Sequence, residues 1–182
     1  MIQKVLFKET IAMMLLGTLV LAGSPAMAGT ERMDGSTTQA TPFDNKISRS
    51  GALESLSRVP ETTSADQLFL TARSFRYKKD DATSDLWQTP QETEQRWAGD
   101  CEDKAVWLYA NLKQNGYQDV RLVIGRFRAG LHVWVTMPDG QGGYFILDPT
   151  AHKRIWNASD FPENLYRPLY SFDGLERYRH DV

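Results

Sequence analysis

The chain has 182 residues, a formal net charge of −2, and 41% hydrophobic and 24% charged residues. This length allows one domain of ordinary size, and the composition is typical of a soluble globular protein. Proteins that bind nucleic acid or anionic lipid carry clusters of Lys and Arg, whereas the basic residues of this chain are scattered, so a nucleic-acid partner is not expected.

The first 28 residues have the pattern of a secretory signal peptide. Lys4 and Lys8 give a short positive region, and residues 11–22 form an apolar run. Residues 26–28 then supply an A-x-A cleavage site, and the apolar run is short for a membrane span. We therefore expect cleavage after Ala28, which leaves a mature protein without a membrane segment. An uncleaved anchor is the alternative.

Residues 29–63 are rich in Gly, Ser, Thr and Pro and contain few large apolar side chains. This composition predicts a flexible leader, which places the folded domain at residues 64–182. The domain is expected to open on a helix, because a capping-box pattern at Ser64 precedes apolar residues with helical spacing. A second, short helix should begin after Thr89, which is followed by a proline and then a glutamate in the capping-box position.

A central helix should follow Asp100, a capping residue, and end at Asn115 and Gly116. Its expected apolar face consists of Ala105, Leu108, Tyr109 and Leu112. Three strands are predicted next, at residues 120–127, 131–137 and 144–148. The aromatic residues after Ser159 should pack against this sheet. A helix-first, sheet-later order predicts an α+β fold, with the central helix packed on an antiparallel sheet.

Cys101, the only cysteine, falls in the first turn of the predicted central helix. A lone thiol in an exported protein is buried and inert, linked to another chain, or reactive. The unpaired N–H groups and the dipole at a helix N-terminus stabilise a thiolate, which is the form that attacks a carbonyl carbon. Cys101 is therefore the candidate nucleophile.

His132 and Asp148 are the candidate partners of this thiol. A hairpin centred on Gly140 places the two residues opposite each other on one face of the sheet. A carboxylate in that position holds one imidazole nitrogen and leaves the other for a thiol. A two-residue slip would leave the pair diagonal and close, whereas a one-residue slip would separate them. A structural histidine and a turn aspartate before Pro149 are the alternatives.

Three segments resemble the signatures of transglutaminase-like domains: Gly-Asp-Cys-Glu-Asp-Lys-Ala at 99–105, Leu-His-Val-Trp-Val at 131–135, and Phe-Ile-Leu-Asp-Pro-Thr at 145–150. With Trp-x-x-Pro-x-Glu at 87–92 they look most like the bacterial transglutaminase-like cysteine proteinases, which include periplasmic adhesin-cleaving proteases. The resemblance implies a papain-like core, a Cys101–His132–Asp148 catalytic triad, a periplasmic location and a protein or peptide substrate.

Asp100, Glu102 and Asp103 surround Cys101 with negative charge, which would raise the pKa of its thiol. Helix capping is one role for these carboxylates. Calcium ligation is the other, because calcium is a hard cation that prefers carboxylate oxygens. The resemblance points to calcium too, since the adhesin-cleaving relatives depend on calcium through carboxylates beside the cysteine. No His/Cys cluster indicates zinc.

Several other residues have expected places. The backbone N–H of Cys101 is the expected oxyanion donor, and Gln95 is expected at the surface. Trp87 and Trp97 are expected in the core, with walls of a cleft as the alternative. His152 and His180 are expected at the surface.

Proteolysis through a covalent acyl-enzyme is the expected activity. Transglutaminase or amidase activity is the first alternative, because the same three residues would serve all of these reactions. A non-catalytic peptide-binding module on the same fold is the second. The sequence indicates neither the identity of the substrate nor the oligomeric state.

Overall fold

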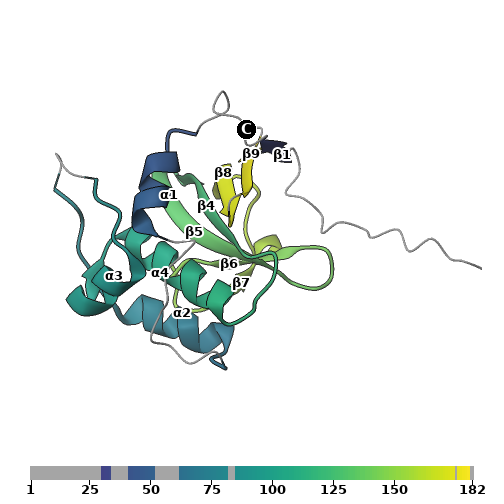
Figure 1. Cartoon of the computed structure of the whole chain (residues 1–182). Coiled ribbons are helices and arrows are strands. Elements are labelled where there is room, and N and C mark those ends of the chain that lie inside the picture. The colour runs from purple at the N-terminus through teal and green to yellow at the C-terminus, as the bar shows by residue number, and fades with distance from the viewer. Residues whose placement is uncertain (1–29, 34–40, 52–61, 82–84, 175, 181–182) are drawn as a thin grey trace, which may run out of the picture.

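The structure, a computed structural model, describes residues 30–33, 41–51, 62–81, 85–174 and 176–180 (Figure 1). The expected signal peptide lies outside these residues, so its cleavage stays a prediction. Among the described helices, none combines the length and apolar character that a membrane span requires.

Four α-helices are described, α1 (Asp44–Ser50), α2 (Ala65–Ser74), α3 (Pro90–Arg96) and α4 (Cys101–Gln114). Helix α4 begins directly after Asp100, as the sequence predicts, and α2 and α3 begin at the two predicted capping boxes. The Ser64 side chain accepts from the backbone N–H of Gln67 at the start of α2, and Thr89 and Glu92 form the equivalent box at α3. Both predictions depend only on residues within one helical turn, which is why the sequence alone was sufficient.

The described strands are β1 (Thr30–Met33), β2 (Arg76–Tyr77), β3 (Ala98–Gly99), β4 (Arg121–Phe127), β5 (Gly130–Pro138), β6 (Tyr144–Leu147), β7 (Trp156–Asn157), β8 (Tyr166–Asp173) and β9 (Glu176–His180). Seven of these form one antiparallel sheet in the order β1-β9-β8-β4-β5-β6-β7. The other two, β2 and β3, pair in parallel beside α4. The predicted α+β class is confirmed, as is the packing of the chain after Ser159, which supplies β8 and β9.

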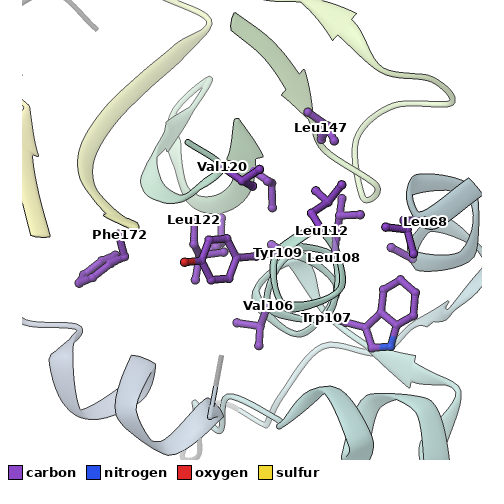
Figure 2. Close-up of a cluster of buried hydrophobic side chains, with 14 of the residues drawn as sticks. Leu68, Val106, Trp107, Leu108, Tyr109, Leu112, Val120, Leu122, Leu147 and Phe172 are labelled. Carbon is purple, nitrogen blue, oxygen red and sulfur yellow. The ribbon is translucent and has the colours of Figure 1, made fainter. Parts of the chain in front are cut away.

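Helix α4 lies at the centre of the main core (Figure 2). Leu108 and Leu112 are fully buried on the predicted apolar face. The side chains around them come from α2, β4, β6 and β8, and include Leu68, Leu122, Leu147 and Phe172. Truncating one such leucine costs about 2–5 kcal/mol, so this packing fixes the position of the N-terminus of α4.

The opposite face of the sheet carries a smaller cluster built from Val123, Trp134, Ile146 and Tyr166. Side chains alternate along β5, so that Val133 and Val135 face α4 while Trp134 faces this second cluster. His132 is two residues from Trp134 and therefore shares its face, which separates the histidine from the aliphatic core.

The expectation of a flexible leader at residues 29–63 is wrong for two parts of that segment. Thr30–Met33 is the edge strand β1, which pairs with β9 through partners such as Thr30 and His180. Asp44–Ser50 is helix α1, whose Ile47 is buried in the main core. Few large apolar residues are needed here because a strand at the sheet edge is held by backbone hydrogen bonds. Residues 34–40 and 52–61 lie outside the described part.

Candidate active site

The start of α4 is fixed by a close approach of the chain to the helix. A side-chain carbon added to Gly99 would lie 2.5 Å from Cβ of Asp103, so only glycine fits there. Asp103 is fully buried, and its carboxylate accepts from the backbone N–H groups of Asp100 and Gln88 over 3.2 and 2.8 Å. This box sets Cys101 as the first residue of the helix.

Cys101 faces the beginning of β5. Strand β6 pairs with β5 only from Val135 onward, and the thiol lies beside the backbone N–H of Val133. Cys101 and His132 line one pocket, together with residues from α1, the segment before α3, and β4. These further residues are Phe43, Lys46, Asp85, Trp87, Glu102, Ile124, Leu131 and Val133. The pocket thus brings the candidate nucleophile and the candidate base together.

His132 and Asp148 are in contact, although the predicted hairpin register is wrong. Val135 pairs with Leu147, which places the centre of the hairpin at Gln141, and the two sides are shifted by two residues relative to the register centred on Gly140. The shift leaves the pair diagonal, and Nε2 of His132 lies 2.7 Å from Oδ2 of Asp148. The other ring nitrogen, Nδ1, remains for the thiol.

The Asp148 carboxylate is buried and held at both oxygens. Oδ1 accepts from the backbone N–H groups of Thr150 and Ala151 over 3.0 and 2.9 Å. Burial by itself would raise the pKa of Asp148, but the contact with His132 and the hydrogen bonds from Ala151 and Tyr166 together outweigh it and lower the pKa. A carboxylate that stays ionised in this position stabilises an imidazolium.

The surroundings of Cys101 favour the thiol over the thiolate. Burial, followed by the charge and hydrogen bond of Glu102, raises its pKa well above the ordinary value, and the N–H of Val133 opposes this only in part. The thiol donates to Oε2 of Glu102 over 3.0 Å. Burial and the neighbouring Asp100 raise the pKa of Glu102 itself to about 8.

Three carboxylates lie together beside the thiol. Asp80, Asp100 and Glu102 each offer an oxygen within 4.8 Å of the others. Asp100 is buried, and its Oδ1 has no hydrogen-bond partner among the described residues. Asp103, expected among the calcium ligands, lies outside this group because its carboxylate serves the capping box. Asp80 takes its place.

Of the other residues with an expected place, some lie where the sequence predicts and others do not. Gln95 is exposed, as expected. Trp87 is buried in the core and also lines the pocket, whereas Trp97 is 53% exposed, which contradicts a core position. His180 is buried between Ser171 and Thr30, so its expected surface position is wrong.

His152 also departs from its expected place at the surface. It is half-buried and lies 2.8 Å from the hydroxyl of Tyr166. The sequence does not predict Asp80, Tyr166 or Phe43 as residues of the site, because they come from a polar loop, a tail strand and the expected leader. No spacing in the sequence connects these segments to the cysteine motif, so no local signal could have found them.

Solved structures of Legionella pneumophila LapG resemble the chain. The first has a TM-score of 0.54 and 24% identity, over 68% of this chain and 71% of that chain. A calcium-bound form has a TM-score of 0.53 at the same identity and coverage. An EGTA-treated form has a TM-score of 0.54 and 24% identity, over 68% of this chain and 69% of that chain. No protein-family model and no curated protein matches the chain. The chain therefore shares the fold of LapG, and this fold has the α+β class that the sequence predicted.

Proposed function

We propose that the chain is an exported thiol protease of the transglutaminase-like cysteine proteinase kind. The observation that carries this proposal is one pocket that holds the only cysteine, at a helix N-terminus, and His132, whose Nε2 is bound by a buried carboxylate. Acyl transfer at a peptide bond is the chemistry that uses a thiol, an imidazole and a carboxylate together.

In the proposed reaction the thiol of Cys101 gives its proton to Nδ1 of His132, and the thiolate adds to the carbonyl carbon of a peptide bond. Asp148 keeps the ring in place and stabilises the imidazolium. His132 then protonates the leaving amine as the C–N bond breaks, which leaves a thioester on Cys101. A water molecule that loses a proton to His132 hydrolyses the thioester. The backbone N–H of Cys101 is the proposed oxyanion donor.

The chemistry of the pocket walls suits a peptide substrate. Phe43, Trp87 and Leu131 are apolar, and Leu131 is 59% exposed at the pocket. An apolar side chain of an extended peptide would bury its surface against these residues, at about 25 cal/mol for each Å² removed from water.

Calcium is the cation that the carboxylate cluster fits. Three oxygens within 4.8 Å of one another, with the buried Oδ1 of Asp100 lacking a partner, form a hard, anionic donor set. Asp80, Asp100 and Glu102 would hold the ion, and its charge would favour the thiolate form of Cys101. The calcium-bound and EGTA-treated structures of LapG give this proposal further support.

Export is supported by the signal-peptide pattern of residues 1–28, and the periplasm is the proposed location. Mass spectrometry of the exported protein should find Gly29 as its first residue. Recovery of a chain that begins at Met1 would contradict cleavage.

The experiment that tests the proposed function uses the mature protein and the exported proteins of its own cell, with millimolar calcium. N-terminal labelling should detect new peptide ends that are absent when Cys101→Ala replaces the active chain. Cross-linked products without new ends would indicate transglutaminase activity instead. Stable capture of a protein, equal for both chains and without new ends, would indicate the peptide-binding module.

A further inference from the structure

The hydroxyl of Tyr166 joins a second histidine to the proposed triad. Tyr166, on β8, is buried, and its hydroxyl donates to Oδ2 of Asp148 over 2.8 Å. The same hydroxyl lies 2.8 Å from Nε2 of His152. Because Oδ2 is also the oxygen that His132 contacts, the four side chains form a continuous chain in the order His132, Asp148, Tyr166, His152.

The direction of each hydrogen bond follows from the number of protons. The hydroxyl has one proton, and a carboxylate can only accept, so Tyr166 donates to Asp148 and accepts from Nε2–H of His152. Burial, together with the charge of Asp148, raises the pKa of Tyr166, so the hydroxyl keeps its proton. Burial lowers the pKa of His152 and favours the neutral ring; the charge of Asp148 opposes this effect and the charge of Arg128 assists it.

The ring of His152 is fixed by aromatic neighbours. It stacks on Phe161 with a centroid distance of 5.1 Å and an interplanar angle of 24°, and it makes T-shaped contacts with Trp156 and Phe127. Its backbone N–H donates to the carbonyl oxygen of Asp148 over 3.0 Å. A histidine held on both its ring and its backbone presents Nε2 to Tyr166 in one orientation.

We propose that Tyr166 and His152 are positioning residues that set the basicity of His132 through Asp148. The orientation of Asp148 does not require Tyr166, because two backbone N–H groups already hold Oδ1. Tyr166 instead reduces the negative charge that Oδ2 offers to His132, because both side chains donate to this oxygen. A carboxylate oxygen that gives part of its charge to a second donor stabilises an imidazolium less. His152, by donating to the hydroxyl, makes that hydroxyl a stronger donor. This inference rests on the proposed triad.

The test is an NMR titration of ¹⁵N-histidine-labelled mature protein that carries Cys101→Ala, with millimolar calcium. The chain has three histidines, so few ring signals need assignment. The ring of His152 should show the Nε2–H tautomer. Tyr166→Phe should raise the pKa of His132 by on the order of half a unit, as expected when a donor to its partner carboxylate is lost.

The matched control is Tyr144→Phe. Tyr144 is partly buried in the same side-chain cluster, and its hydroxyl makes no hydrogen bond with the described residues. The Tyr144→Phe substitution should leave the titration of His132 unchanged. His152→Phe should shift the pKa of His132 in the same direction as Tyr166→Phe does. His152→Gln keeps a hydrogen-bond donor for Tyr166 and should leave the pKa of His132 as it is in the parent chain.

Equal titrations in the Tyr166→Phe and Tyr144→Phe chains would overturn the inference, as would an Nδ1–H tautomer at His152. If Tyr166→Phe does not fold, the comparison of His152→Phe with His152→Gln decides. None of these measurements requires a substrate. The proposed function is tested separately, by the rate at which iodoacetamide alkylates Cys101 in the chain that retains this cysteine. If His132→Ala leaves that rate unchanged, the proposed triad is wrong, but the titrations still report whether Tyr166 and His152 affect His132.

Discussion

The thiol of Cys101 donates a hydrogen bond over 3.0 Å to Oε2 of Glu102, the next residue along the chain. The nucleophile of the proposed triad is thus held as a thiol by a carboxylate, although His132 lines the same pocket. The negative charge that raises the pKa of the thiol comes from the residues that form the candidate calcium site. Metal binding at this site would therefore also activate the thiol of the proposed enzyme.

The first prediction concerns Cys101 itself. Cys101→Ala should abolish activity and change the midpoint of thermal unfolding by little, because the side chain is only partly buried and its hydrogen bond joins adjacent residues. Peptide-end labelling and thermal denaturation followed by circular dichroism measure the two quantities. An active mutant would show that Cys101 is not the nucleophile, and a mutant that does not fold would show that Cys101 is a structural residue.

The second prediction separates calcium ligation from helix capping. Titration calorimetry should detect calcium binding that is lost in Asp80→Asn and in Asp100→Asn, because each removes a carboxylate from the cluster. Asp103→Asn should instead lower the free energy of unfolding by about 1–3 kcal/mol, because an amide cannot accept from all the donors around that buried position.

Asp81→Asn is the matched control, since Asp81 follows Asp80 in the same loop but lies outside the cluster. It should bind calcium as the parent chain does. If the parent chain shows no heat of binding at millimolar calcium, the proposed calcium site is wrong, and the carboxylates have structural roles alone.

The third prediction tests Asp148. Asp148→Asn is nearly isosteric and should keep the fold, yet lower the rate, because an amide does not stabilise the imidazolium. The same change in a serine triad costs about 10⁴-fold. We expect a loss on the order of 10- to 1,000-fold, since a thiolate and an imidazolium can form a pair before the substrate arrives.

Asp139→Asn controls for the stability of the hairpin. Asp139 accepts from the backbone N–H groups of Gln141 and Gly143, so it supports the turn that joins β5 and β6 without touching the pocket. Its substitution should change the rate little. Similar losses from both substitutions would mean that Asp148 acts through the hairpin alone.

The fourth prediction concerns pH and His152. Burial lowers the pKa of His152 below its ordinary value of 6.5. Protons therefore bind more tightly to the unfolded chain, so this contribution to stability is complete above pH 6.5 and is lost as the pH falls through the folded-state pKa. His152→Gln keeps a donor for Tyr166 and should lose less stability than the parent chain on acidification.

The midpoint of thermal unfolding, measured at several pH values on both sides of neutrality, checks this. The comparison between the two chains is needed because burial raises the pKa of Asp103 to about 6, which has the opposite effect on stability. If the difference in unfolding midpoint between the two chains does not grow as the pH falls, His152 is not a buried, neutral ring.

Much of the fold could be predicted because the signals are local. Capping boxes at Ser64 and Thr89 fix two helix starts, and alternation along β5 assigns Val133 and Trp134 to opposite faces. The hairpin register could not be predicted from symmetry about Gly140. The Asp139 carboxylate accepts from the backbone N–H groups of Gln141 and Gly143, and the turn that these hydrogen bonds stabilise has its centre at Gln141.

The sequence by itself determined that a lone cysteine begins a capped helix, and that a histidine and an aspartate on one hairpin fall on the same face of the sheet. These relationships depend on neighbours within a turn or a hairpin, where backbone geometry leaves few choices. Only the tertiary structure decided that Asp80 joins Asp100 and Glu102, and that Tyr166 joins Asp148 to His152. Asp80 lies in a loop before α4 and Tyr166 lies on a strand beyond the β5–β6 hairpin, so no helical turn or hairpin register ties either residue to its partners. Their positions depend on how α4 and the sheet pack.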